Sequence, residues 1–333
     1  MTAPLIVGLA GLELLEPERE FLAAVRPLGI IVFRRNIADA EQLTALVGNA
    51  LAASGAALAF VDQEGGRVQR VRPPLAPRYP AAAAIGALYA NDPAAARRAA
   101  FLGGYLIARD LAPFGLNVPC LPVADVPVRG AHDVIGDRAY GLAPQVVAEL
   151  AGAAADGVLA AGALPVMKHL PGHGRAHVDS HLSLPDVDTP RDALTADFTP
   201  FHALNTLPMG MTAHVRYAAI DPDAPATLSS AAISLIRDEI GFGGLLMTDD
   251  ISMGALGPDV AANAARALRA GCDCVLHCNG DLDEMRAIAA ALPPITPAAG
   301  ARLAAALAAR RTPAAADIAV LRAEFDTLLG AGA

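Results

Sequence analysis

Eight short apolar segments, spread over most of the chain, set the strongest limit on how this sequence can fold. They are apolar almost throughout rather than alternately polar, which is typical of strands covered on both faces. Stretches with helical periodicity, such as residues 39–54 and 143–162, separate them. One strand followed by one helix, eight times over, predicts an α/β fold, the single (β/α)8 TIM barrel. The segments lie at residues 4–10, 28–33, 56–62, 117–125, 164–169, 209–215, 243–250 and 272–278.

Chain length and composition agree with this fold. A chain of 333 residues suits one large barrel or two ordinary domains, and a hydrophobic content of 54% is enough for a sizeable core. No repeat or low-complexity linker interrupts the pattern. We therefore predict one domain over residues 1–333, with alanine-rich helices at about 294–330 packed on the barrel.

Charge and local sequence exclude several classes of protein. A net charge of −9 argues against a nucleic-acid partner, which would need a basic face. The first apolar stretch has no preceding Lys or Arg and is interrupted by Glu13, unlike a secretory signal, and no apolar run is long enough to span a membrane. We expect a cytoplasmic protein without a membrane partner, and a monomer.

The four cysteines, three of them within GCDCVLHCNG, could suggest a metal site. Their place in an apolar segment favours buried strand residues instead, and their low density argues against a disulfide framework. They are Cys120, Cys272, Cys274 and Cys278.

Titratable residues stand where the predicted strands end. Asp62 closes the third segment, Lys168 and His169 the fifth, and the pair Asp249 and Asp250 the seventh. His214 stands near the end of the sixth. Because the active site of such a barrel lies at the carboxyl ends of its strands, these residues predict a catalytic site.

Four histidines follow one another at intervals of four in KHLPGHGRAHVDSH. A helix would align them on one face, but the prolines and glycines of this stretch oppose a helix and predict a long loop. The spacings that identify a zinc site, such as HExxH, are missing, so we predict no metal. The four are His169, His173, His177 and His181.

Five motifs, in order along the chain, resemble those of glycoside hydrolase family 3. They are FVDQEGGRVQR, IGDRAYG, KHLPGHG, DSH and MTDDISMGA. The resemblance extends from about Leu5 to Cys278 and is greatest to the single-domain bacterial β-N-acetylglucosaminidases of peptidoglycan recycling. The second domain of many larger family members has no counterpart in this sequence.

The resemblance implies a retaining exo-β-N-acetylglucosaminidase that needs no cofactor. By motif position Asp249 matches the nucleophile, His181 the proton donor and acceptor, and Asp179 the partner of that histidine. The residues that match contacts to the terminal N-acetylglucosamine are Asp62, Arg70, Arg138, Lys168 and His169. The implied substrates are muropeptides that carry 1,6-anhydro-N-acetylmuramic acid, cleaved during cell-wall recycling.

The residue types are compatible with these roles. Retaining glycosidases usually employ two carboxylates, but an imidazole titrates near neutral pH and can also donate and recover a proton. Asp179 can orient that ring. Adjacent strand residues point oppositely, so we expect only one of Asp249 and Asp250 to face the sugar, and Glu64, before two glycines, to serve a turn. The lack of Trp fits a pocket for one sugar rather than a polymer groove.

Three alternatives stay open at this point. A histidine base would not repel phosphate as a carboxylate would, so the same site could belong to a phosphorylase. Lys168 could instead form a Schiff base in an aldolase with a phosphorylated substrate, or the barrel could bind sugar without turning it over. The roles of His173, His177 and His214, and the natural leaving group, are not decided by the residues themselves.

Overall fold

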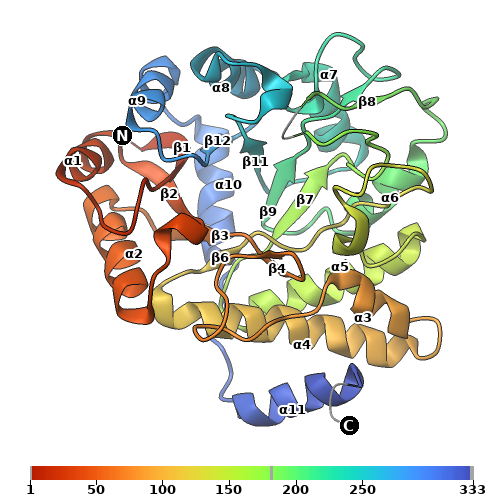
Figure 1. The fold of residues 1–333 in the computed structure, drawn as a ribbon. Helices are drawn as coiled ribbons and strands as arrows, with labels where there is room; N and C mark the ends of the chain where they lie inside the picture. The colour runs from red at the N-terminus through yellow and green to blue at the C-terminus, as the bar shows by residue number, and fades with distance from the viewer. Residues whose placement is uncertain (1, 181–182, 331–333) are drawn as a thin grey trace.

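The protein is described by a computed structural model that covers residues 2–180 and 183–330. All eight predicted strands are present and lie parallel in one sheet, in the order β6-β3-β2-β1-β12-β11-β9-β7 (Figure 1). Their bounds are β1 Ala3–Gly8, β2 Pro27–Val32, β3 Leu58–Val61, β6 Val118–Pro119, β7 Val166–Leu170, β9 Met209–Thr212, β11 Leu245–Asp250 and β12 Cys274–His277.

The two edge strands of this sheet, β6 and β7, come together through the segment that follows β6. Val123 forms a parallel bridge to Lys168, and the N–H of Ala124 donates to the carbonyl of Lys168 at 2.7 Å. The sheet thus closes almost completely into a barrel surrounded by helices. The predicted (β/α)8 fold is confirmed.

Each strand buries side chains on both faces, which explains why its sequence is apolar throughout. Along β1, Ile6 points into a cluster inside the barrel with Phe60 and Met247. Its neighbours Leu5 and Val7 join the layer between the sheet and the helices. Both layers exclude water, so neither face of a strand has room for polar residues.

Several helices begin at a side-chain cap, and α2 is an example. The Asp39 carboxylate accepts from the N–H of Gln42 at the start of α2, and Gly55 ends that helix in the left-handed conformation. The helices are α1 Glu16–Val25, α2 Ala40–Ser54, α3 Ala82–Leu88, α4 Pro93–Leu111, α5 Pro144–Ala160, α6 Thr195–Ala203, α7 Ser230–Ser234, α8 Val260–Ala270, α9 Leu282–Ala291, α10 Pro297–Ala308 and α11 Ile318–Leu328.

Two small pairs of strands were not predicted. β4 (Gln63–Gly65) and β5 (Val68–Gln69) form an antiparallel hairpin after β3, and β8 (Asp186–Val187) pairs with β10 (Arg216–Tyr217). The first pair, called the hairpin below, follows the carboxyl end of a barrel strand and therefore lies where the active site is expected.

The last two helices pack on different parts of the molecule. Ala306 of α10 is buried with the cluster inside the barrel. α11 lies along α4 (Figure 1), where Arg98 and Glu324 form a bidentate ion pair with distances of 2.7 and 2.8 Å.

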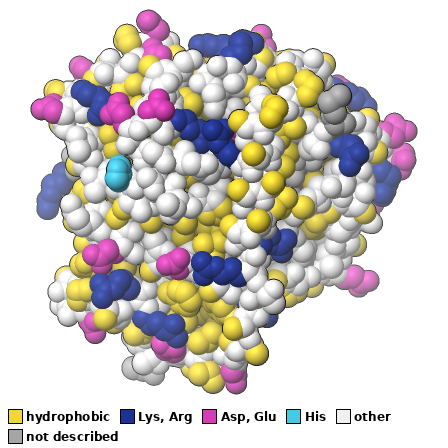
Figure 2. Space-filling model, turned by 180° about the vertical axis from the view of Figure 1, so that it is seen from behind, with side chains coloured by type: hydrophobic (Ala, Val, Ile, Leu, Met, Phe, Trp, Pro, Cys, Tyr) yellow, Lys and Arg dark blue, Asp and Glu magenta, His cyan; other side chains and the backbone are white. Residues whose placement is uncertain are grey.

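The surface mixes charges of both signs. Figure 2 shows basic and acidic side chains interspersed among apolar ones over the rear face of the molecule. Among the described residues, no helix is long and apolar enough to cross a membrane. The four cysteines are buried and none is in a disulfide, as their place in apolar strands predicts.

Candidate active site

One pocket gathers the titratable residues at the carboxyl ends of the strands. It brings together six of the eight predicted site residues, while Asp179 lies half-buried on the loop after β7 and His181 lies outside the described residues. The polar side chains that line the pocket are Asp62, Arg70, Arg138, Lys168, His169, His173, Ser180, Asp249 and Asp250.

Apolar side chains complete the wall of the pocket. Their number fits a ligand with an apolar part as well as hydroxyls. They are Ile31, Phe33, Val68, Val134, Ile135, Met211, Met253, Leu276 and Cys278.

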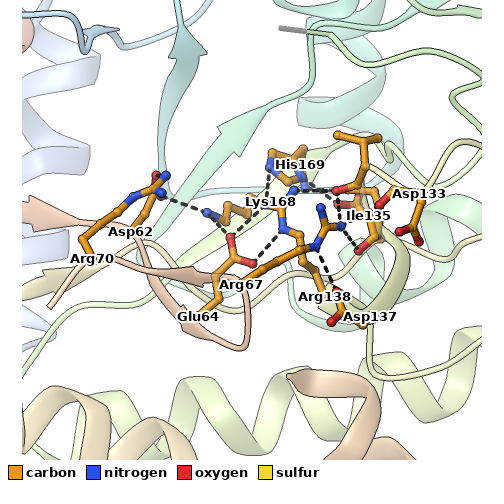
Figure 3. A network of polar contacts seen from close by, with 12 residues as sticks. Asp62, Glu64, Arg67, Arg70, Asp133, Ile135, Asp137, Arg138, Lys168 and His169 are labelled. Carbon is orange, nitrogen blue, oxygen red and sulfur yellow. Dashed lines mark hydrogen bonds and ion pairs between the residues drawn. The ribbon is translucent and has the colours of Figure 1, made fainter. Parts of the chain in front are cut away.

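Glu64 is the centre of an ion-pair network on one side of the pocket (Figure 3). Its Oε1 lies 2.6 Å from Lys168 Nζ and 2.8 Å from Arg138 Nη2, and its Oε2 accepts from Arg138 Nε at 2.8 Å. Lys168 also contacts Asp62 Oδ1 at 3.2 Å. Glu64, expected to serve a turn behind the sugar contacts, also pairs with two of those contacts, because β4 aims its side chain at Lys168 and Arg138.

These contacts fix the charge of each partner. Burial disfavours the ionised form of Glu64, but attraction to Arg138 and Lys168 outweighs it and lowers the pKa of Glu64 to about 2. Burial likewise opposes the charge of Lys168, yet Asp62 and Glu64 raise its pKa above the ordinary value. Lys168 is held as an ammonium donor, which is unsuited to the Schiff-base chemistry of an aldolase.

Arg70 and Asp62 form the neighbouring part of the wall. Arg70 Nη2 donates to Asp62 Oδ2 at 2.9 Å, and its guanidinium lies 5.5 Å from the ring centre of Phe33. Burial alone would raise the pKa of Asp62, but Lys168 and Arg70 hold it below its usual value. Asp62 therefore faces the pocket as a carboxylate, able to accept from a hydroxyl group.

Arg67 ties the tip of the hairpin to the segment that carries Arg138 (Figure 3). It donates to Asp137 Oδ1 at 3.0 Å and to the carbonyl oxygens of Asp133 and Ile135 at 2.6 and 3.2 Å. This link holds Arg138 against Glu64 from behind.

Asp125, which was not predicted, orients His169. Its Oδ2 lies 2.6 Å from His169 Nδ1, and its Oδ1 accepts from the N–H of His173 at 2.6 Å. Burial opposes its charge, but His169 keeps the pKa of Asp125 below its usual value. Since Nδ1–H donates to Asp125, Nε2 of His169 is an acceptor, and it lies 3.5 Å from Arg138 Nη2 in the pocket wall. Asp125 ends the fourth predicted strand, so the strand-end rule could have found it.

The loop after β7 is anchored through its first residues. His173 is buried and its Nε2 lies 3.1 Å from the hydroxyl of Ser180, while Arg175 pairs with Asp197 at 2.8 Å. Burial lowers the pKa of His173 to about 4, with a further contribution from His169, so the ring is neutral at neutral pH. His177 is exposed. The interval of four thus places these histidines in different surroundings.

Asp249 is the penultimate residue of β11 and lines the pocket. The N–H of Asp250 donates to Asp249 Oδ1 at 2.8 Å. Burial would raise the pKa of Asp249, but the nearby imidazoles of His214 and His169, together with this hydrogen bond, place it below the usual value. Asp249 is a carboxylate at neutral pH and has free access to the pocket, as a nucleophile requires.

Asp250 also lines the pocket, contrary to the expectation that it would point away. Its carboxylate accepts from the Ser252 hydroxyl at 2.9 Å and from the N–H of Cys278 at 3.1 Å. The register of β11 against β12 shifts between Met247 and Asp250, so the alternation of a regular strand no longer applies there. These hydrogen bonds fix the Asp250 carboxylate, which stabilises the turn that follows it.

Within residues 2–180 and 183–330, no three His, Cys, Asp or Glu side chains converge as a metal site. The acidic and basic groups instead pair with one another.

Comparison with known proteins agrees with this geometry. Residues 9–300 match the glycosyl hydrolase family 3 N-terminal domain. The chain is 43% identical over 287 residues to a β-hexosaminidase of Alkalilimnicola ehrlichii, covering 84% of this chain and 81% of that one. It is 40% identical over 283 residues to a β-hexosaminidase of Aromatoleum aromaticum, covering 83% and 79%.

A solved structure shares the whole fold. NagZ from Neisseria gonorrhoeae, in complex with N-trifluoroacetyl-D-glucosamine, superposes with a TM-score of 0.87 at 31% identity and covers 100% of this chain and 98% of its own. The chain therefore belongs to glycosyl hydrolase family 3 and is a glycoside hydrolase of the β-hexosaminidase type.

Proposed function

We propose that the protein is a retaining exo-β-N-acetylglucosaminidase in which Asp249 is the nucleophile. The observation that carries the proposal is the place of Asp249. It is an ionised carboxylate at a strand end, facing a pocket whose other polar groups are paired donors and acceptors suited to sugar hydroxyls.

The reaction has two steps. The Asp249 carboxylate attacks C1 of the terminal sugar while the C1–O bond breaks and His181 gives its proton to the departing oxygen. His181 then takes a proton from water, whose oxygen attacks C1 and releases Asp249, so that the configuration at C1 is retained. Asp179 orients His181 and favours its charged form.

Binding of the sugar falls to the cations and carboxylates described above. Arg138 and Lys168 remain charged and can donate to sugar oxygens, Asp62 can accept from a hydroxyl, and Arg70 and His169 complete the set. A pocket lined by residues from several strands is suited to one terminal sugar and hence to exo cleavage.

Labelling of the nucleophile tests the proposal. A fluorinated N-acetylglucosaminyl fluoride, which forms the covalent intermediate faster than it hydrolyses, should add one sugar to the protein mass, and peptide mapping should place it on Asp249. A label on any other carboxylate would overturn the assignment. Assays in phosphate buffer that yield N-acetylglucosamine rather than its 1-phosphate would exclude a phosphorylase.

We further infer the biological substrate from the resemblance of the motifs. The expected leaving group is a 1,6-anhydro-N-acetylmuramoyl peptide, and the expected setting is cell-wall recycling by a single-domain, monomeric enzyme in the cytoplasm. Incubation with purified anhydromuropeptides should release N-acetylglucosamine, detected by mass spectrometry. Light scattering after gel filtration should give the mass of one chain, 33.9 kDa.

A further inference from the structure

His214 is fully buried behind Asp250, and the reaction outlined above does not use it. Its Nε2 lies 2.9 Å from the carbonyl oxygen of Asp250. β9 and β11 pair only as far as Met211 and Met247. Beyond that point His214, two residues after β9, supplies to β11 the donor that a main-chain N–H would otherwise provide.

The hydrogen bonds around His214 define its tautomer. A carbonyl oxygen can only accept, so Nε2 carries a hydrogen, and in the neutral ring Nδ1 accepts. The donor to Nδ1 is then the Thr227 hydroxyl at 2.7 Å, which also lies 3.1 Å from the carbonyl oxygen of Ala213 and 2.7 Å from Thr212 Oγ1. The relay runs from Thr212 through Thr227 and His214 to the Asp250 carbonyl, and all three side chains are fully buried.

Asp250 is thereby held on several sides. His214 binds its carbonyl, the next N–H, from Ile251, donates to Leu276 at 2.9 Å, and Ser252 and Cys278 bind its carboxylate. Its own N–H donates to Asp249 Oδ1. Any rotation of Asp250 would misdirect that donor.

We propose that His214 is a positioning residue for the nucleophile, acting through the Asp250 carbonyl to aim the Asp250 N–H at Asp249. The proposal rests on the function proposed above. It gives a purpose to a neutral ring at this place: the relay aligns Asp249 without forming an ion pair that would reduce its nucleophilicity. Burial lowers the pKa of His214, which keeps the ring neutral at neutral pH.

Replacement of His214, with a matched control, tests the proposal. In H214L the turnover number kcat for nitrophenyl β-N-acetylglucosaminide should fall about 100-fold, the size of effect seen when one preorganised donor is lost, with KM changed less than about threefold. H214Q keeps an amide donor and should recover at least about tenfold of that loss.

The control is His277 on β12, equally buried and bonded to Glu284 at 2.8 Å. H277L should lower thermal stability with kcat within about twofold of the unmodified enzyme.

The pH profile gives a second readout that loss of stability alone would not move. The groups that face Asp249 are His214, His169, Lys168 and the N–H of Asp250, and those that face His214 are Asp249, Asp250 and His169. In H214L the acidic limb of kcat/KM should move to higher pH, because Asp249 loses an aligned donor.

A milder pair of variants covers the case in which H214L does not fold. T227V removes the hydroxyl that binds His214 Nδ1, and T227S keeps it. We expect kcat to be about tenfold lower in T227V than in T227S. Equal kcat for this pair, or equal losses in H214L and H277L, would overturn the inference. Full activity in D249A would instead show that Asp249 is not the nucleophile. Failure of the proposed function and failure of the His214 inference can therefore be told apart.

Discussion

Two groups of buried residues that support the active-site pocket, called walls below, are built on opposite principles. The ionic wall, formed by Asp62, Glu64, Arg138 and Lys168, consists of buried charges that neutralise one another. The neutral wall, formed by Thr212, His214, Thr227 and the Asp250 carbonyl, is a chain of uncharged hydrogen bonds beside one carboxylate, Asp249.

The difference matches the role proposed for each wall, sugar binding for the ionic wall and reaction for the neutral wall. Sugar hydroxyls are neutral, and charged donors bind them more strongly than neutral donors, so the ionic wall suits recognition. A nucleophile needs its charge free for the attacked carbon, so the neutral wall suits reaction. We therefore expect changes in the ionic wall to act on both stability and sugar binding, and changes at Asp249 to act on turnover.

The largest effect should follow from D249A. Without the carboxylate no glycosyl-enzyme can form, and kcat should fall by more than about a thousandfold while the melting temperature stays the same or rises. Turnover of nitrophenyl β-N-acetylglucosaminide and thermal unfolding are the measurements. Turnover that survives in D249A would contradict the assignment of reaction to Asp249 and of sugar binding to the ionic wall.

The next effect should come from E64Q in the ionic wall. Loss of the shared carboxylate leaves Arg138 and Lys168 without their closest partner, and the free energy of unfolding should fall by about 3 kcal/mol. KM should rise about tenfold, since both cations lose their positions. A KM that stays unchanged in a folded variant, with unfolding followed in urea, would show that Glu64 does not set the sugar-binding geometry.

Acid should weaken the ionic wall in a defined pH window. The pKa of Glu64 is about 2 in the folded protein against an ordinary 4.5. A depressed carboxyl pKa stabilises the fold above the unfolded value, so this contribution is complete above pH 4.5 and is lost as pH falls toward 2. The loss amounts to about 3 kcal/mol. The free energy of unfolding, measured in urea at each pH over this range, should change more steeply with pH for the unmodified protein than for E64Q.

His173 should give a similar dependence at higher pH. Its pKa is about 4 in the folded protein against an ordinary 6.5, so the stability it contributes is complete above pH 6.5 and is lost as pH falls to 4. The change is about 3 kcal/mol at most. H173N should lack this slope, whereas H177N, which alters an exposed histidine of the same loop, should keep it.

The smallest effect should come from E324Q, which sharpens the comparison by separating geometry from burial. Arg98 and Glu324 form a bidentate pair much like that of Arg138 and Glu64, but their side chains are 42% and 39% exposed rather than 12% and 7%. An exposed pair contributes less than about 1 kcal/mol. Thermal unfolding should change little and kcat/KM not at all. A loss equal to that of E64Q would mean that burial is not the deciding factor.

Much of this architecture could be predicted from the sequence because its signals are local. Continuous apolar runs predict buried parallel strands, and a titratable residue at the end of such a run predicts the place of Asp62, Lys168 and Asp249 in one pocket. The same rule applied to residues 117–125 would also have indicated Asp125.

The parts that could not be predicted depend on contacts between distant segments. Glu64 precedes two glycines, which indicates a turn, and only the folded hairpin shows that its carboxylate meets Arg138, 74 positions later in the chain. The sequence places His214 near the end of a strand, and only its contact with Thr227 in the folded protein shows how its ring is fixed. The roles of Asp179 and His181 remain predictions, and His181 lies outside the described residues.

Tyr79 supports the hairpin and connects the proposed sugar pocket with α11. Tyr79 accepts the N–H of Gly66 at its carbonyl and donates from its hydroxyl to Asp110, which also binds Arg322 of α11. Phe325 of the same helix lies 6.2 Å from the Tyr79 ring. A version of this enzyme shortened before α11 would lose the outer support of the proposed sugar-binding site, so the terminal helix is a poor place to trim when the protein is engineered.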